Sequence, residues 1–250
     1  MDIRALAEKY EGYIIEQRRW FHAHPELSWE EFGTTDHIQE ELEKMGLEVH
    51  RFEGRPGCTA MIYGGKAVPG AKTVALRADI EALPVEEKTG LPFASENPGV
   101  MHACGHDGHT AILLGAAKIL NEHKDEIAGK IILFFERAEE NGGGMPQMLA
   151  YMDKHGITAD TCYGTHLFAM LESGKVGLIT GGTMSTAMGF NITIHGKGGH
   201  GSRPDQANSP IDCFVAIYNA LQAARLTKIT PFKPLTLSVG LPRPCAGGGE

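Results

Sequence analysis

The residues most able to do chemistry in this chain gather in one short segment, residues 101–109. Its sequence, MHACGHDGH, contains Cys104, His106 and two further histidines. A thiolate and an imidazole separated by one glycine can hold a divalent cation with little chain entropy left to lose. Borderline ions such as Zn²⁺ accept sulfur, nitrogen and oxygen ligands together. The segment therefore predicts one part of a metal site.

Two further clusters follow predicted strands. Glu139 and Glu140 come directly after the apolar run of residues 130–135, and His166 follows residues 161–165. Because ligands gather beyond the carboxyl ends of strands in α/β sheets, the three clusters are expected at one edge of a sheet. Successive side chains of an extended chain point in opposite directions, so one carboxylate can ligate a cation while its neighbour faces a water. That division of labour suits hydrolysis, in which the free carboxylate accepts a proton from the water.

Each cluster alone also has an ordinary structural explanation. A lone cysteine is most often a small buried apolar residue, and adjacent acids after a strand are most often solvated loop charges. The three clusters together favour the metal site. Two alternatives stay open: Cys104 could be a thiol nucleophile with a histidine base, or the protein could be non-catalytic, with a structural zinc ion or an inactive site.

The spacing of apolar residues predicts helices that alternate with strands. Helices are expected from about residue 6 to 21, from an N-cap at Thr34 or Thr35 to Gly46, and over residues 108–122, 146–154 and 211–226. Strands are expected over residues 58–63, 73–76, 130–135, 161–165 and 175–179. The run 130–135 is apolar throughout, which is typical of a strand covered on both faces. We therefore predict an α/β fold with helices on both sides of the sheet.

The pattern changes near residue 180. Residues 190–195 and 235–239 alternate apolar with polar side chains, which is typical of strands with one solvated face. A glycine-rich turn at residues 196–201 carries His200. We predict two domains: residues 1–180, which contain the three clusters, and residues 181–250, a smaller α+β unit with an antiparallel sheet.

Composition limits the possible classes of protein. The chain has 250 residues, of which 42% are apolar and 22% charged, as in ordinary globular proteins. Its formal net charge of −8 argues against nucleic acid and anionic membranes as partners. Five widely spaced cysteines argue against a disulfide framework, and no apolar run approaches the ~18 residues of a membrane span. We expect a cytoplasmic protein.

Six segments, taken in order, resemble the M20 metallopeptidase family. The resemblance is to its amidohydrolase subgroup, which includes hippurate hydrolase, N-acyl-amino-acid amidohydrolases and indole-acetyl-amino-acid hydrolases. The matching segments are residues 18–27 (RRWFHAHPEL), 77–84 (RADIEALP), 101–109, 138–140 (AEE), 164–166 (GTH) and 196–200 (GKGGH). They run in family order along nearly the whole chain, and their combination is highly specific.

This resemblance implies roles for individual residues. Cys104, His106, Glu140 and His166 would be metal ligands, and Glu139 would be the general base and proton shuttle. The cofactors would be two divalent cations, Mn²⁺ or Zn²⁺, with Co²⁺ or Ni²⁺ as alternatives. His200 would help to hold the scissile carbonyl oxygen, often across a dimer. Asp79 would support a ligand or anchor a loop.

The resemblance also implies a fold and a reaction. The family has a catalytic α/β domain interrupted by a satellite domain, through which it commonly dimerises. The expected reaction is hydrolysis of the amide bond in N-acyl amino acids, including hippurate-like substrates. The family's pattern continues well past 250 residues and includes a later histidine ligand. We therefore expect a truncated chain that lacks one ligand of the metal pair.

Overall fold

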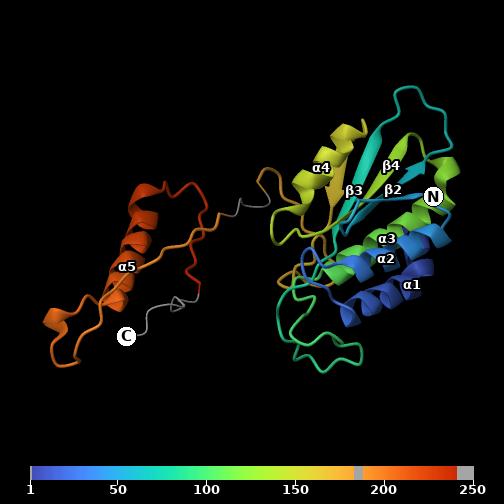
Figure 1. Ribbon diagram of the computed structural model, residues 1–250. Helices are drawn as coiled ribbons and strands as arrows, with labels where there is room; N and C mark the ends of the chain where they lie inside the picture. The colour runs from blue at the N-terminus through green and yellow to red at the C-terminus, as the bar shows by residue number, and fades with distance from the viewer. Residues whose placement is uncertain (1, 183–187, 241–250) are drawn as a thin grey trace. The chain divides into compact units, whose positions relative to one another are not determined.

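The computed structural model describes residues 2–182 and 188–240 (Figure 1). The chain divides into two compact units, Met1–Gly177 and Leu178–Glu250. The first contains a sheet with helices on both faces, and the described part of the second contains one long helix. Among the described residues, no helix has both the length and the apolar character needed to cross a bilayer.

Five strands form one mixed sheet in the first unit, in the order β1-β2-β4-β3-β5. They are β1 (Val49–Arg51), β2 (Cys58–Tyr63), β3 (Thr73–Asp79), β4 (Lys130–Glu136) and β5 (Thr161–Gly164). Strand β3 runs parallel to β4 and to β5, whereas β2 is antiparallel to β1 and β4. The carboxyl ends of β3, β4 and β5 therefore lie at the same edge of the sheet.

Helices cover both faces of this sheet (Figure 1). They are α1 (Ile3–Ala23), α2 (Phe32–Lys44), α3 (His106–Glu122) and α4 (Gly144–Lys154), with a short 3₁₀ helix η1 (Lys124–Glu126). Strand β4 divides the core, because its alternate side chains face opposite sides. Ile131, Leu133 and Phe135 pack with the side chains of α1, α2 and α3, whereas Ile132 and Phe134 pack with those of α4. The predicted α/β fold is confirmed.

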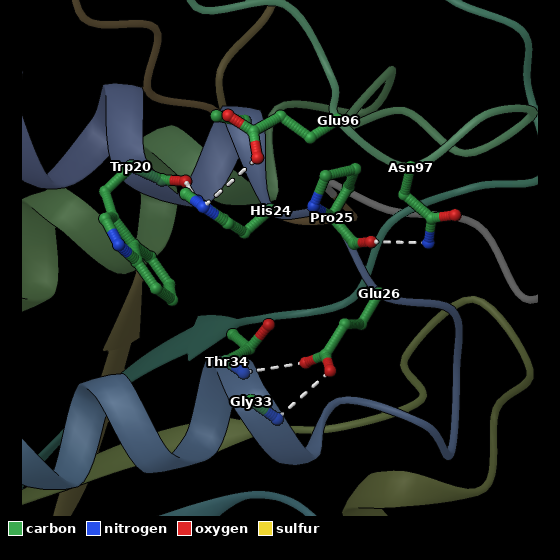
Figure 2. A pocket seen from close by; sticks show the side chains of 9 residues that line it. Trp20, His24, Pro25, Glu26, Gly33, Thr34, Glu96 and Asn97 are labelled. Atoms are coloured by element: carbon green, nitrogen blue, oxygen red, sulfur yellow. Dashed lines mark hydrogen bonds and ion pairs between the residues drawn. The ribbon is translucent and has the colours of Figure 1, made fainter.

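The start of α2 corrects one expectation. Thr34 and Thr35 were predicted as N-caps, but both lie inside the helix and are buried. The carboxylate of Glu26, in the preceding loop, accepts hydrogen bonds from the backbone N–H groups of Gly33 (3.0 Å) and Thr34 (2.7 Å) (Figure 2). A side chain from outside the helix therefore satisfies donors that the first turn leaves free, and the local threonine pattern was misleading for that reason.

Most other predicted elements of the first unit are present within a few residues. The end of α2 is also as expected, because Gly46 adopts a left-handed φ of 76°. The predicted strand over residues 175–179 is wrong, since those residues form no strand. Their apolar side chains are largely exposed and have no neighbouring strand to pair with.

The second unit contains α5 (Pro210–Lys228) and a 3₁₀ helix η2 (Pro204–Gln206). Ser209 caps α5, because its side chain accepts a hydrogen bond from the N–H of Asp212. The strands predicted over residues 190–195 and 235–239 are absent from the described part of this unit. Alternation predicts which side chains share a face, but a strand also needs a partner for its backbone groups. Residues 241–250, the end of the predicted second domain, lie outside the described residues.

Candidate metal centre

The structure brings the four predicted ligands together at the carboxyl edge of β3, β4 and β5. The Sγ of Cys104 lies 3.5 Å from the Nε2 of His166, and the Nε2 of His106 lies 3.9 Å from an oxygen of Glu140. Two sets of donor atoms, one from Cys104, His106 and His166 and one from His106, Glu139 and Glu140, each lie within 4.8 Å of one another. Metal–ligand bonds of about 2.0–2.3 Å fit such separations.

His106 begins α3, and Cys104 lies two residues before it in the preceding loop. Gly105 lies between Cys104 and His106 and has a φ of 96°, a conformation that favours glycine. One turn further on, a Cβ atom at Gly108 would lie only 2.5 Å from the Cδ1 of Leu167. The absence of a side chain at Gly108 therefore lets the loop after β5 approach the start of α3, and that loop carries His166.

His106 gives the strongest single indication that a cation binds here. Its side chain is 1% exposed, and neither ring nitrogen has a hydrogen-bond partner among the described residues. Its Nδ1 lies 3.6 Å from Glu81, and its Nε2 lies 3.7 Å from Asp79. Burial alone would lower the pKa of His106, but the surrounding carboxylates, that of Glu81 foremost, outweigh burial and raise it. A buried imidazole without partners costs about 1–3 kcal/mol, so a cation at Nε2 would satisfy both the nitrogen and the negative surroundings.

Asp79 and His109 form a hydrogen-bonded pair, and an oxygen of Asp79 lies 3.7 Å from the Nε2 of His106. The backbone N–H of Leu167 donates to the Nε2 of His109 (2.7 Å), so the ring carries its hydrogen on Nδ1 and donates it to Asp79 (2.5 Å). Both nitrogens of His109 are thus engaged in hydrogen bonds, although Asp79, His106 and His109 also form a group of donor atoms that could hold a cation. Burial opposes ionisation of Asp79, but the hydrogen bond from His109 and the nearby positive charges lower its pKa to about 2. A second oxygen of Asp79 accepts from Arg77 at 2.7 Å.

Glu139 and Glu140 lie in a turn just beyond the end of β4. The N–H of Gly142 donates to the backbone oxygen of Glu139 (2.8 Å), which closes this turn. Burial and the negative charge of Asp79 raise the pKa of Glu139. A carboxylate whose pKa is raised towards the pH of the reaction can both accept a proton and return it efficiently.

The thiol of Cys104 is electrostatically disfavoured as a free anion. Burial, with the neighbouring carboxylate of Glu140 as a second cause, raises the pKa of Cys104 to about 12. Nucleophilic cysteines depend on a lowered pKa. The surroundings of this thiol therefore suit a cation-bound thiolate better than a free nucleophile.

Glu81 is a further residue of the site, to which the sequence patterns assigned no role. It is 1% exposed, and one of its oxygens accepts from the backbone N–H of Glu140 (2.6 Å). Its other oxygen is the one that faces His106. Glu81 follows Asp79 by two residues, and residues two apart in an extended chain share a face. That spacing was the available signal.

His200 lies in the second unit, on an exposed turn, where its Nδ1 is 2.8 Å from the hydroxyl of Ser202. Its role in holding a carbonyl oxygen stays a prediction, as do the ligand roles of Cys104, His106, Glu140 and His166.

Comparison with known proteins gives a consistent group of relatives. Thermostable carboxypeptidase 1 of Saccharolobus solfataricus is 43% identical over 240 residues, which are 95% of this chain and 59% of that protein. The N-acyl-L-amino acid amidohydrolase of Geobacillus stearothermophilus is 41% identical over 239 residues, or 95% of this chain and 63% of that protein. The chain thus spans about three fifths of the length of these curated relatives.

A crystal structure shares the fold. The YXEP protein of Bacillus subtilis, a dinuclear metal-binding peptidase of the M20 family, superposes with a TM-score of 0.63 and 37% identity over 69% of this chain and 47% of that one. The model of peptidase family M20/M25/M40 matches residues 75–238, which include all four predicted metal ligands. On this match the chain belongs to peptidase family M20/M25/M40.

Proposed function

We propose that this protein is a metal-dependent amidohydrolase that cleaves the amide bond of N-acyl amino acids, including hippurate-like ones. The single observation that carries the proposal is the buried imidazole of His106, whose nitrogens have no hydrogen-bond partner among the described residues. It lies among sulfur, nitrogen and carboxylate donors at one edge of the sheet. Relatives named as an N-acyl-L-amino acid amidohydrolase and a carboxypeptidase support amide cleavage.

The proposed ligands are Cys104, His106, Glu140 and His166. Divalent cations bound to them, Mn²⁺ or Zn²⁺ in our proposal, would acidify a water and polarise the substrate carbonyl. The mixed sulfur, nitrogen and oxygen donors suit borderline ions. Two ions are favoured because His106 belongs to three groups of donor atoms that could each hold a cation, and because the B. subtilis relative is dinuclear.

Glu139 is the proposed general base. As the water oxygen attacks the carbonyl carbon, Glu139 accepts a proton from that water. It then donates the proton to the amide nitrogen while the carbon–nitrogen bond breaks. The products are a carboxylic acid and a free amino acid. The raised pKa of Glu139 supports both halves of this transfer.

The remaining assignments extend this proposal to the whole chain. Residues 1–180 would form the catalytic domain, and residues 181–250 would form part of a satellite domain through which the protein dimerises. His200 would then support the substrate carbonyl, while Asp79 would hold His109 beside the centre. A cytoplasmic location suits the thiols, since the described cysteines are free.

A turnover assay combined with metal analysis tests the proposal. The purified chain, loaded with Mn²⁺ or Zn²⁺, is incubated with N-acetyl and N-benzoyl amino acids, and the released amino acid is quantified. We expect metal-dependent release and more than one bound ion per chain. A single tightly bound ion without turnover would instead indicate a structural or inactive site. Turnover that persists after the ions are removed would support a thiol nucleophile.

A further inference from the structure

Two residues other than glycine have a left-handed backbone conformation in the described part of the chain, Trp29 (φ 73°) and Ala138 (φ 50°). L-residues with a side chain rarely adopt this conformation, and they persist in it where surrounding contacts enforce it. Ala138 directly precedes Glu139 and Glu140. The conformation of Ala138 therefore sets the direction in which the chain enters the turn that carries both acids.

The residue that holds Ala138 in place is Glu31, which directly precedes α2. The Oε1 of Glu31 accepts a hydrogen bond from the N–H of Ala138 at 2.8 Å, and Glu31 is completely buried. Glu31 is itself fixed at the start of α2, since its backbone oxygen accepts from the N–H of Thr35 (3.0 Å). Its other carboxylate oxygen has no partner among the described residues. The N–H of Ala138 is thus one of the backbone donors beside this buried carboxylate, and those of Trp29 and of Glu31 itself are the others.

Trp29 braces the same turn from a second point. The guanidinium carbon of Arg137 lies 5.6 Å from the centre of the Trp29 ring. A Cβ at Gly143 would lie 2.5 Å from the Trp29 ring, so the indole packs directly on the backbone there. The short segment from Trp29 to Glu31 therefore contacts both ends of the turn around Glu139.

A second buried carboxylate holds the far side of Glu139. Glu81 accepts from the N–H of Glu140 at 2.6 Å, while Glu31 accepts from the N–H of Ala138. The backbone amides on either side of Glu139 are thus held by different carboxylates from different parts of the chain. Glu81 also faces His106, whereas Glu31 is not among the proposed ligands, and within the described residues no hydrogen bond or ion pair joins it to their side chains.

We propose that Glu31 is a positioning residue, which keeps Ala138 in its left-handed conformation and so directs Glu139 and Glu140 into the metal centre. The role deepens the proposed function and rests on it. Without the acceptor, the buried N–H of Ala138 loses its partner and the residue can relax to a negative φ. The peptide then rotates, and both carboxylates move. Displacement of reacting groups by about 1 Å can lower a rate by about 10²-fold.

Three substitutions of Glu31 separate the hydrogen bond from charge and bulk. Glu31→Gln keeps the length and one acceptor oxygen but loses the charge. Glu31→Asp keeps the charge but withdraws the acceptor by one methylene. Glu31→Ala removes the acceptor altogether. If the hydrogen bond acts as proposed, the Glu31→Gln variant should resemble the wild type, and the Glu31→Asp variant should resemble the Glu31→Ala variant.

Glu26→Ala is the matched control. Glu26 also holds backbone N–H groups at the start of α2, those of Gly33 and Thr34 (Figure 2). In the part of the chain that the structure describes, no hydrogen bond joins its side chain to the turn around Glu139. Its loss should reduce the stability of α2 without changing the metal centre. Circular dichroism and thermal unfolding of every variant report folding independently of function.

The first readout is a Co²⁺ titration of the full metal-free chain, followed by visible absorption. Glu31→Asp and Glu31→Ala should weaken Co²⁺ binding about tenfold or more, in the range seen for residues that orient ligands. Glu31→Gln and Glu26→Ala should stay within about threefold of the wild type. The second readout is turnover of an N-acyl amino acid, where we expect kcat to fall in Glu31→Asp while KM stays nearly constant.

Each result has a definite meaning. Wild-type Co²⁺ affinity and kcat in Glu31→Asp would overturn the positioning role, as would an equal loss in Glu31→Gln, because charge would then be the cause. If the Glu31→Ala variant fails to fold, the comparison of Glu31→Gln with Glu31→Asp still tests the positioning role. A wild-type chain that binds Co²⁺ but hydrolyses no N-acyl amino acid refutes the proposed function alone, since the Co²⁺ titrations still judge Glu31.

Discussion

The carboxylate of Asp79 and the imidazole of His109 form a buried pair, with 2.5 Å between Oδ1 and Nδ1. Asp79 ends β3, and His109 lies in the first turn of α3. Through its other nitrogen His109 accepts the N–H of Leu167, the residue after His166. The pair therefore connects a strand, a helix and the loop that carries a proposed ligand.

Asp79→Asn should weaken metal binding by about 10–100-fold, because groups that orient metal ligands contribute about that much. The amide would still accept from His109 but would lose the ionic attraction of Arg77 and of the site's cations. A competition titration with a Zn²⁺ chelator measures the change. Asp153→Asn, at an exposed helix position, is the control and should bind metal like the wild type. Equal affinities in the two variants would contradict the supporting role of Asp79.

Glu139→Gln should keep its metal and lose about 10²–10⁴-fold or more in kcat, since the proton acceptor is removed while the ligands remain. Metal content by atomic emission and single-substrate kinetics are the two measurements. Glu140→Gln should differ, with reduced metal content as the first defect. Near-normal turnover by metal-loaded Glu139→Gln would refute the assignment of the base.

Removal of metal should abolish turnover, and Mn²⁺ or Zn²⁺ should restore it. In the metal-free chain Cys104 should react slowly with iodoacetamide at pH 8, because a pKa of about 12 leaves about one thiol in ten thousand ionised. Mass spectrometry of labelled peptides compares it with the exposed Cys213. Preferential labelling of Cys104, with activity that survives a chelator, would favour a thiol enzyme.

The titration of Glu31 should lower the free energy of unfolding as the pH rises from about 4.5 to about 7. Burial raises the pKa of Glu31 to about 7, against 4.5 in the unfolded chain, so the folded state binds more protons across this interval. By linkage, the stabilisation is present below pH 4.5 and is lost as the pH rises through 7, by up to about 3 kcal/mol.

Urea unfolding in the presence of a chelator at several pH values measures this effect. Glu31→Gln cannot ionise, so its unfolding free energy should fall less than that of the wild type over the same interval. Parallel pH profiles for the two proteins would show that the native carboxyl of Glu31 titrates normally.

Much of the first unit could be predicted because its strongest signals are local. The continuous apolar run of β4 requires cover on both faces, whatever the rest of the chain does. Periodic apolar residues likewise define α1 and α3. The predicted strands over residues 190–195 and 235–239 failed because alternation describes only side chains, and a strand exists where another segment pairs with its backbone.

The residue types of the metal centre were visible in the sequence alone. Cysteine, histidine and paired carboxylates after strands are chemically suited to a cation wherever they meet. Their meeting at one edge was an expectation from parallel topology, and the register of β3 with β4 and β5 gives it a physical basis.

Only the tertiary structure decided which further residues serve this centre. Glu31, Glu81 and His109 act through contacts with Ala138, Glu140 and Leu167, which lie 107, 59 and 58 positions away in the chain. Sequence periodicity reports the face on which a side chain lies, within one element. A hydrogen bond between distant segments depends on how whole elements pack, so the fold alone determines which buried carboxylate meets which amide.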